Sequence, residues 1–209
     1  MTEFRKTFPS PESYIAVSPD SGNDEVRKKN KQPYYTNEEL FLALDRMKAV
    51  PREDFVPESA KATAYMDRAI RLEGGGFLPA PLFHGAMLAE ARPTLDDRVL
   101  IVDAGSGYLP ALVTPLAGKV DVITPEEAAN GDKRGKYTLI LVDGAIEHVP
   151  ATLAKMVEEG GRVVTGMVER GVTRLATGRK SGKALALLPL AEMGIPRLGA
   201  FDRPQSWSF

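Results

Sequence analysis

The chain has 209 residues, of which 43% are hydrophobic and 26% are charged, and its formal net charge is −1. This balance is typical of a soluble globular protein with a full hydrophobic core. The sequence has no basic stripe, which argues against nucleic-acid binding as the main role. It also has no cysteine, which excludes disulfides, thiolate metal sites and cysteine nucleophiles. Because no stretch is apolar enough for a signal sequence or a membrane span, we expect a cytoplasmic protein with no membrane partner. We also assign no metal site.

The N-terminal part divides into an arm and a first helix. Residues 1–33 are rich in Pro, Ser, Asp, Asn and Lys without an apolar period, so we expect an extended or poorly ordered arm followed by a single α/β domain over residues 34–209. Thr36 and Glu39 have capping-box spacing and predict a helix that ends before Pro51. Its apolar face comprises Leu40, Phe41, Leu44 and Met47.

The segment from Arg98 to Ala111 is the centre of the predicted domain. The apolar run 99–102 predicts a buried strand, residues 103–107 a tight turn, and the following apolar stretch a helix. Gly105 and Gly107 favour positive φ angles and close approach of a ligand, and the N–H groups at a helix start hold anions. Taken alone, this pattern is equally typical of a simple tight connection.

The later elements alternate as expected for an open parallel sheet with helices on both faces. The predicted elements are a helix over 109–116, strands over 120–123 and 139–142, a helix over 151–157, a strand over 162–165, and final strands within 172–176 and 184–188.

Several linked motifs carry a resemblance to a known family. In chain order they are Val50-Pro-Arg-Glu-Asp-Phe-Val-Pro57, Ala64-Tyr-Met-Asp67, Gly74–Gly76, Asp97–Tyr108, Tyr137–Ala145, and Val149-Pro150 with Glu159–Val164. Over residues 38 to about 174 the chain resembles the protein-L-isoaspartate O-methyltransferases, in the order of that family. The resemblance implies a doubly wound, Rossmann-like fold that binds S-adenosylmethionine at the carboxyl ends of its strands. It also implies methyl transfer to isoaspartyl carboxylates of polypeptides, the first step of their repair.

The donor-binding turn departs from the family pattern at its beginning. By resemblance the turn comprises Asp103, Ala104, Gly105, Ser106 and Gly107, but Asp103 stands at the first glycine position and Ile101 at the position of an acidic residue. A carboxylate at this point adds bulk and negative charge beside the donor carboxylate, which weakens binding, or it attracts the donor ammonium group. The sequence leaves both interpretations open.

Two further donor contacts are altered or shortened. Thr124 falls where the family has an acidic residue for the ribose hydroxyls, and Glu126 and Glu127 are interpreted as the opening of a helix. Only about fifteen residues connect the strand ending at Ile123 to the strand beginning at Leu139, close to the minimum for a crossover. We therefore expect the intervening helix and third strand to be shortened or lost, leaving a sheet edge exposed.

Asp143 is the best single candidate for a polar contact in the site. It follows a predicted strand, and ligands of open sheets bind at that rim. An aspartate before a glycine is equally often a residue that caps its own loop, so both roles remain open for Asp143.

The substrate loop lacks the hydroxyl groups that the resemblance leads us to expect. By resemblance the loop comprises Phe77, Pro79 and Pro81, and Phe77 and Pro79 fill the two hydroxyl-bearing positions. Their side chains cannot donate a hydrogen bond to an acceptor carboxylate. His84 opens the following helix and is another substrate candidate, although a lone histidine is more often a packed or capping residue.

Three hypotheses follow from these substitutions. The first is an active S-adenosylmethionine-dependent carboxyl methyltransferase with a rebuilt donor site, the second is a non-catalytic relative that binds a polypeptide or another partner, and the third is a nucleotide-binding sensor. Because the donor-binding motifs are degraded, we expect weak or absent donor binding and doubtful activity. No catalytic residue or oligomeric state is assigned.

Overall fold

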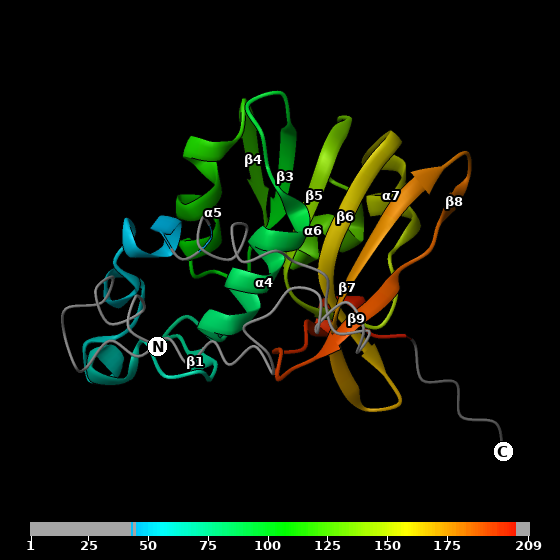
Figure 1. Cartoon of the computed structure of the whole chain (residues 1–209). Helices are drawn as coiled ribbons and strands as arrows, with labels where there is room; N and C mark the ends of the chain where they lie inside the picture. Colours follow the sequence, from blue (N-terminus) through cyan, green and yellow to red (C-terminus); the bar gives the residue numbers. More distant parts are fainter. Residues whose placement is uncertain (1–42, 44, 204–209) are drawn as a thin grey trace, which may run out of the picture.

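A computed structural model describes residues 43 and 45–203, which form a seven-stranded mixed sheet, a small two-stranded sheet and flanking helices (Figure 1). The strands are β1 (Ile70–Arg71), β2 (Phe77–Leu78), β3 (Arg98–Val102), β4 (Lys119–Ile123), β5 (Tyr137–Ile146), β6 (Val157–Glu169), β7 (Val172–Ser181), β8 (Ala184–Leu185) and β9 (Leu188–Glu192). The α-helices are α4 (Pro81–Ala91), α5 (Tyr108–Val113), α6 (Pro125–Asn130) and α7 (Ala151–Met156). Short 3₁₀ helices lie at Arg52–Phe55, Glu58–Thr63, Thr114–Leu116 and Gly199–Phe201.

The large sheet has a parallel half and an antiparallel half. Strands β4, β3, β5 and β6 lie side by side and parallel, with β3 in the middle of the first three. Strand β7 then pairs antiparallel with β6, and β8 and β9 pair with β7. The carboxyl ends of β3 and β4 therefore lie together, which is where open sheets of this kind bind ligands.

Helices cover both faces of the parallel half (Figure 1). Val99 and Ile101 point into a core with α4 and α5, whereas Leu100 and Val102 point into a second core with α6 and α7. All four side chains are fully buried. A strand buried on both faces needs a continuous apolar run, which explains Val99–Val102, and the predicted doubly wound Rossmann-like fold is confirmed.

The connection between β4 and β5 is short, as predicted. It contains only α6, a helix of six residues, and the described chain forms no strand between β4 and β5. Strand β4 is therefore the edge of the sheet. Thr124 caps α6 through a capping box with Glu127, so this acidic residue does open a helix, as the sequence indicates.

The element boundaries differ from the sequence prediction in a few places. Strands β5 and β6 extend well beyond the predicted runs 139–142 and 162–165, and the predicted final stretch 184–188 is divided between β8 and the start of β9. The predicted N-terminal arm, Thr36, Glu39 and most of the first helix lie outside the described residues. Met47 from that helix is buried. None of the described helices combines the length and apolar character needed to cross a bilayer.

An ion pair between the buried Asp97 and the half-buried Arg162 ties the amino end of the parallel sheet to α4. Arg162 on β6 donates to both carboxylate oxygens of Asp97, at 3.0 and 2.8 Å, and to the carbonyl groups of Ala91 and Arg92 at the end of α4. Asp97 also accepts from the Thr138 hydroxyl at 2.7 Å. Burial opposes ionisation of Asp97, but these hydrogen bonds outweigh it and lower the pKa of its carboxyl group.

Candidate functional site

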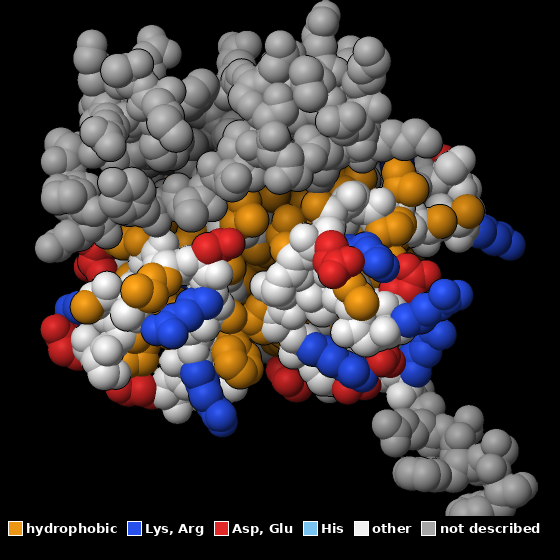
Figure 2. Space-filling view, turned by 60° about the horizontal axis from the view of Figure 1, so that its bottom comes forward, with side chains coloured by type: hydrophobic (Ala, Val, Ile, Leu, Met, Phe, Trp, Pro, Cys, Tyr) orange, Lys and Arg blue, Asp and Glu red, His pale blue; other side chains and the backbone are white. Residues whose placement is uncertain are grey.

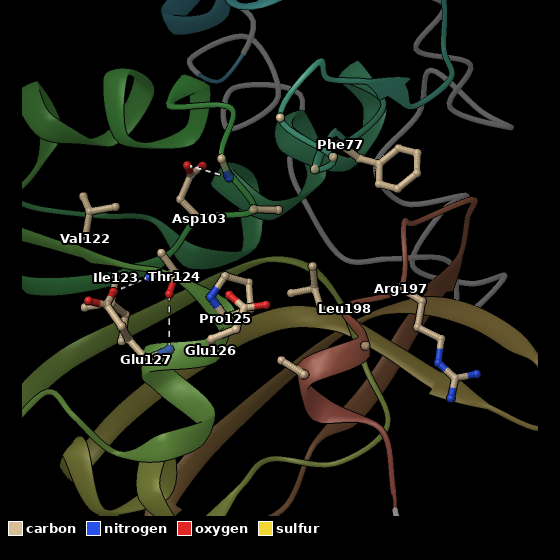
Figure 3. A pocket seen from close by; sticks show the side chains of 17 residues that line it. Phe77, Asp103, Val122, Ile123, Thr124, Pro125, Glu126, Glu127, Arg197 and Leu198 are labelled. Atoms are coloured by element: carbon tan, nitrogen blue, oxygen red, sulfur yellow. Dashed lines mark hydrogen bonds between the residues drawn. The ribbon is translucent and has the colours of Figure 1, made fainter.

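A crevice of about 540 Å³ opens at the carboxyl ends of β3 and β4 (Figure 3). Its walls come from four segments that are distant in sequence: the glycine turn between β1 and β2, the loop after β3, the end of β4 with the start of α6, and a C-terminal segment. The lining residues are Gly74–Phe77, Asp103–Gly105, Val122–Glu127 and Arg197–Ala200. This size is in the ordinary range for small-molecule sites.

The loop after β3 is closed on itself by the carboxylate of Asp103. The N–H group of Gly105 donates to Asp103 Oδ2 at 2.9 Å, and the N–H group of Gly107 donates to Oδ2 at 3.1 Å and to Oδ1 at 3.3 Å. The close-up shows the Asp103 side chain turned onto its own loop (Figure 3). Both glycines have positive φ, 99° and 70°, which lets their N–H groups face this carboxylate. The anion-binding positions of the turn are thus occupied by the chain itself.

The charge of Asp103 has opposing influences. Partial burial and the nearby carboxylate of Asp143 raise the pKa of Asp103. The N–H groups of Gly107 and Gly105 and the Ser106 hydroxyl donate to the carboxylate and lower its pKa. The net shift of the pKa is upward. The loop hydrogen bonds therefore offset only part of the upward shift.

Two acidic side chains on the β4 side of the crevice differ in their hydrogen bonding and exposure. Thr124 accepts from the N–H group of Glu127, and the Glu127 carboxylate accepts from the N–H group of Thr124 at 2.8 Å (Figure 3). Glu127 is therefore turned back onto the helix start, whereas Glu126 lines the crevice and is exposed. Thr124 lies at the crevice, as the sequence predicts, but its hydroxyl is engaged in the cap.

We expect Gly76→Ala to disturb the crevice wall. A Cβ atom at Gly76 would lie 1.9 Å from the carbonyl oxygen of Ala104, so the glycine turn and the loop after β3 would have to separate. We predict a loss of about 1–3 kcal/mol in the free energy of unfolding, measured by urea denaturation. Gly74→Ala is the matched control, because a Cβ atom there meets nothing within 4 Å. Equal stability of the two variants would contradict this close approach.

Behind the crevice, polar groups form a buried chain. Asp143 lies within β5 and its Oδ1 atom is 2.8 Å from His84 Nε2 on α4. His84 Nδ1 lies 3.3 Å from a guanidinium nitrogen of Arg52, and Asp143 Oδ2 lies 3.5 Å from the Ser106 hydroxyl. Arg52, His84 and Asp143 are all fully buried. This row of hydrogen-bonded polar groups thus links the 3₁₀ helix at Arg52–Phe55 to the loop after β3.

The contacts of His84 assign the roles of its two ring nitrogens. A guanidinium group can only donate, so Nδ1 of His84 accepts from Arg52 and Nε2 donates to Asp143. The imidazole ring therefore connects the guanidinium group of Arg52 to the carboxylate of Asp143. Arg52 is fixed further by Nε donating to the carbonyl of Ala64 at 2.7 Å and by a hydrogen bond to the carbonyl of Pro79.

A second pocket of about 670 Å³ adjoins the crevice. Phe77 and Arg197 line both spaces and form the wall between them. The other residues that line this second pocket come from the turn before β1, the start of α4, strand β7 and the segment after β9. They are Asp67–Ala69, Ala80, Leu82, Phe83, Thr173 and Met193–Pro196. Most of these side chains are apolar.

The structure separates the candidate residues into groups. Asp103, Ala104, Gly105, Thr124 and Phe77 line the crevice. Ser106 and Gly107 belong to the same loop, whereas Asp143 and His84 are buried behind it. Pro79 and Pro81 are also buried, and Pro79 contributes only its carbonyl group, to Arg52.

Sequence reasoning missed the C-terminal wall of the crevice. The 3₁₀ helix at Gly199–Phe201 is held against β5, where the N–H group of Leu198 donates to the carbonyl of Ala145 at 2.9 Å. A Cβ atom at Gly144 would lie 2.6 Å from Leu198 Cγ, so glycine allows this approach. Gly144 was therefore a signal of this approach in the sequence, but the same residue is equally typical of a turn.

The chain is similar to proteins of a known family. The family model described as "Protein-L-isoaspartate(D-aspartate) O-methyltransferase (PCMT)" matches residues 23–130. A protein-L-isoaspartate O-methyltransferase of Roseiflexus sp. (strain RS-1) is 29% identical over 182 residues, which cover 75% of this chain and 84% of that protein. Protein-L-isoaspartate O-methyltransferase 2 of Anaeromyxobacter sp. (strain Fw109-5) is 31% identical over 146 residues, which cover 58% and 60% of the two chains.

Solved structures show the same fold. A crystal structure assigned to a protein-L-isoaspartate O-methyltransferase from Plasmodium falciparum, in complex with S-adenosyl-L-homocysteine, has a TM-score of 0.63 at 14% identity. The match covers 84% of this chain and 95% of that one. A second protein-L-isoaspartate O-methyltransferase structure has a TM-score of 0.61 at 17% identity and covers 78% and 65%.

Proposed function

Because the chain belongs to the protein-L-isoaspartate(D-aspartate) O-methyltransferase family, we propose that it binds the class of target named by that family, a polypeptide with an isoaspartyl carboxylate, and transfers methyl groups slowly or not at all. The family uses S-adenosylmethionine as its methyl donor. The observation that carries this proposal is the position of the Asp103 carboxylate in the loop after β3.

The crevice does not fit the amino-acid carboxylate of this donor. The N–H groups of Gly105 and Gly107 are the natural partners of an anion in this turn, and both already donate to Asp103. A donor carboxylate would have to displace Asp103 or lie beside its negative charge. Both alternatives cost binding free energy, so the donor should bind weakly.

The adjoining pocket supports binding of a polypeptide. It lies on the far side of Phe77 from Asp103, is mostly apolar, and is large enough for one or two side chains. The pocket does not involve the Asp103 loop, so a member of this family with a weakened donor site keeps the means to bind its target. This observation supports the binding part of the proposal whether methyl transfer is slow or absent.

Calorimetric titration with S-adenosylmethionine tests the proposal. We expect no measurable heat for the wild-type chain up to millimolar donor, and binding at least about tenfold tighter for Asp103→Gly, which frees the N–H groups of Gly105 and Gly107. Asp103→Asn is the control: it removes the charge but keeps an acceptor oxygen on the loop, so its affinity should lie between the two.

Two results would contradict a weakened donor site. One is one-to-one binding of the donor at micromolar concentration by the wild-type chain, and the other is unchanged affinity in Asp103→Gly. Methylation of an isoaspartyl peptide, measured in parallel, then separates the slow methyltransferase from the non-catalytic binding protein.

A further inference from the structure

The second pocket has a mostly apolar wall that also includes two arginines, Arg68 and Arg197. Phe77, Phe83, Met193 and Ile195 supply apolar surface. Arg68, in the turn before β1, is exposed and also lines the pocket. In the space-filling view, hydrophobic side chains gather at the centre of the face brought forward, with charged side chains around them (Figure 2). Such a combination fits a ligand with one anionic group next to an apolar group.

The three charged residues of this pocket differ in their availability. Asp67 accepts from the N–H group of Leu82 at the start of α4, at 3.1 Å. Arg197 is bound to Glu147 and to Asp202, each at 2.7 Å, so its charge is already balanced. The guanidinium group of Arg68 makes no hydrogen bond or ion pair with the part of the chain that the structure describes. Arg68 is therefore the pocket cation that is available to an incoming anion.

The loop that contains Phe77 and Pro79 cannot bind a carboxylate through these two side chains. Phe77 presents a phenyl ring to the pocket, and the ring of Pro79 is buried. Neither side chain has a donor. An arginine guanidinium group can donate two parallel hydrogen bonds to a carboxylate. Arg68 can therefore supply the hydrogen-bond donors that Phe77 and Pro79 lack.

We propose that Arg68 is the specificity-determining residue for the target, binding the isoaspartyl carboxylate while a neighbouring apolar side chain of the polypeptide occupies the pocket beside Phe83 and Ile195. This inference rests on the proposed function, because the identity of the target comes from it. The inference itself rests on three observations: Arg68 lines the pocket, it is exposed, and its guanidinium group has no partner among residues 43 and 45–203.

Fluorescence anisotropy on the full chain tests the role of Arg68. The probes are a labelled isoaspartyl peptide with a leucine beside the isoaspartyl residue, the same peptide with its isoaspartyl carboxylate methylated, and the peptide with ordinary aspartate. Arg68→Gln should weaken binding of the isoaspartyl peptide by about tenfold. Arg71→Gln is the matched control, since Arg71 is an exposed arginine on the neighbouring strand β1 that does not line the pocket.

The outcomes separate this inference from the proposed function. A tenfold loss in Arg68→Gln alone, together with weak binding of the methylated peptide, supports the role of Arg68. Binding that is equal in Arg68→Gln and Arg71→Gln overturns it and leaves the proposed function standing. If the ordinary aspartyl peptide binds as well as the isoaspartyl one and depends on Arg68, the carboxylate site stands and the isoaspartyl target falls. Absence of binding for all three peptides overturns both.

Discussion

Replacement of Arg52 by methionine is expected to lower the free energy of unfolding by about 3–5 kcal/mol. Arg52 is fully buried, so the variant leaves the carbonyl groups of Ala64 and Pro79 without a donor and removes the positive charge that balances Asp143. It also removes the cation stacked 5.2 Å from the centre of the Tyr108 ring. Urea denaturation at neutral pH measures the loss.

Arg52→Lys is the matched control for this variant. Lysine keeps the positive charge, but it lacks the planar guanidinium fork with which Arg52 reaches Ala64, Pro79 and His84 at the same time. We expect it to be less stable than the wild type and more stable than Arg52→Met. A stability of Arg52→Met within about 0.5 kcal/mol of the wild type would show that the buried chain contributes little.

Replacement of Asp97 by asparagine should cost about 3 kcal/mol at neutral pH, because it leaves Arg162 without its ionic partner at the amino end of the sheet. The pH dependence supplies a second test. The pKa of Asp97 is lower in the folded protein than its ordinary value of 3.8, so its contribution to stability is present above that value and is lost as the pH falls below it.

Denaturation of wild type and Asp97→Asn between pH 7 and pH 2.5 measures this contribution. The difference in free energy of unfolding between the two proteins should be nearly constant above pH 5 and should shrink as the pH falls below 3.8, the ordinary pKa of an aspartate. A difference that stays constant down to pH 2.5 would contradict the lowered pKa.

The sequence predicted the scaffold because its signals are local. The run Val99–Val102 is apolar on both faces of a strand, and two glycines follow it within five residues, so strand, turn and helix could be assigned from one segment. The loss of the third strand followed from the small number of residues between Ile123 and Leu139. Fold and family were therefore predictable.

The buried polar chain could not be predicted in the same way. Its hydrogen bonds join residues that are 32 and 59 positions apart, and no periodic pattern relates Arg52, His84 and Asp143. Asp143 was expected at an accessible rim because the apolar run ends at Val142, but β5 continues to Ile146 and encloses the side chain. The orientation of Asp103 onto its own loop likewise depends on backbone angles that the sequence does not specify.

The position of β4 at the edge of the sheet has a consequence for solubility. An edge strand offers unpaired N–H and C=O groups to any other extended chain, which is a route to aggregation. On β4 the carboxylate of Asp121 lies 3.6 Å from the ammonium group of Lys119 and 3.4 Å from that of Lys133, and it accepts from the Tyr137 hydroxyl. A strand arriving at this edge would have to strip water from these charges, so the ion pairs protect the edge left by the missing strand from polymerisation.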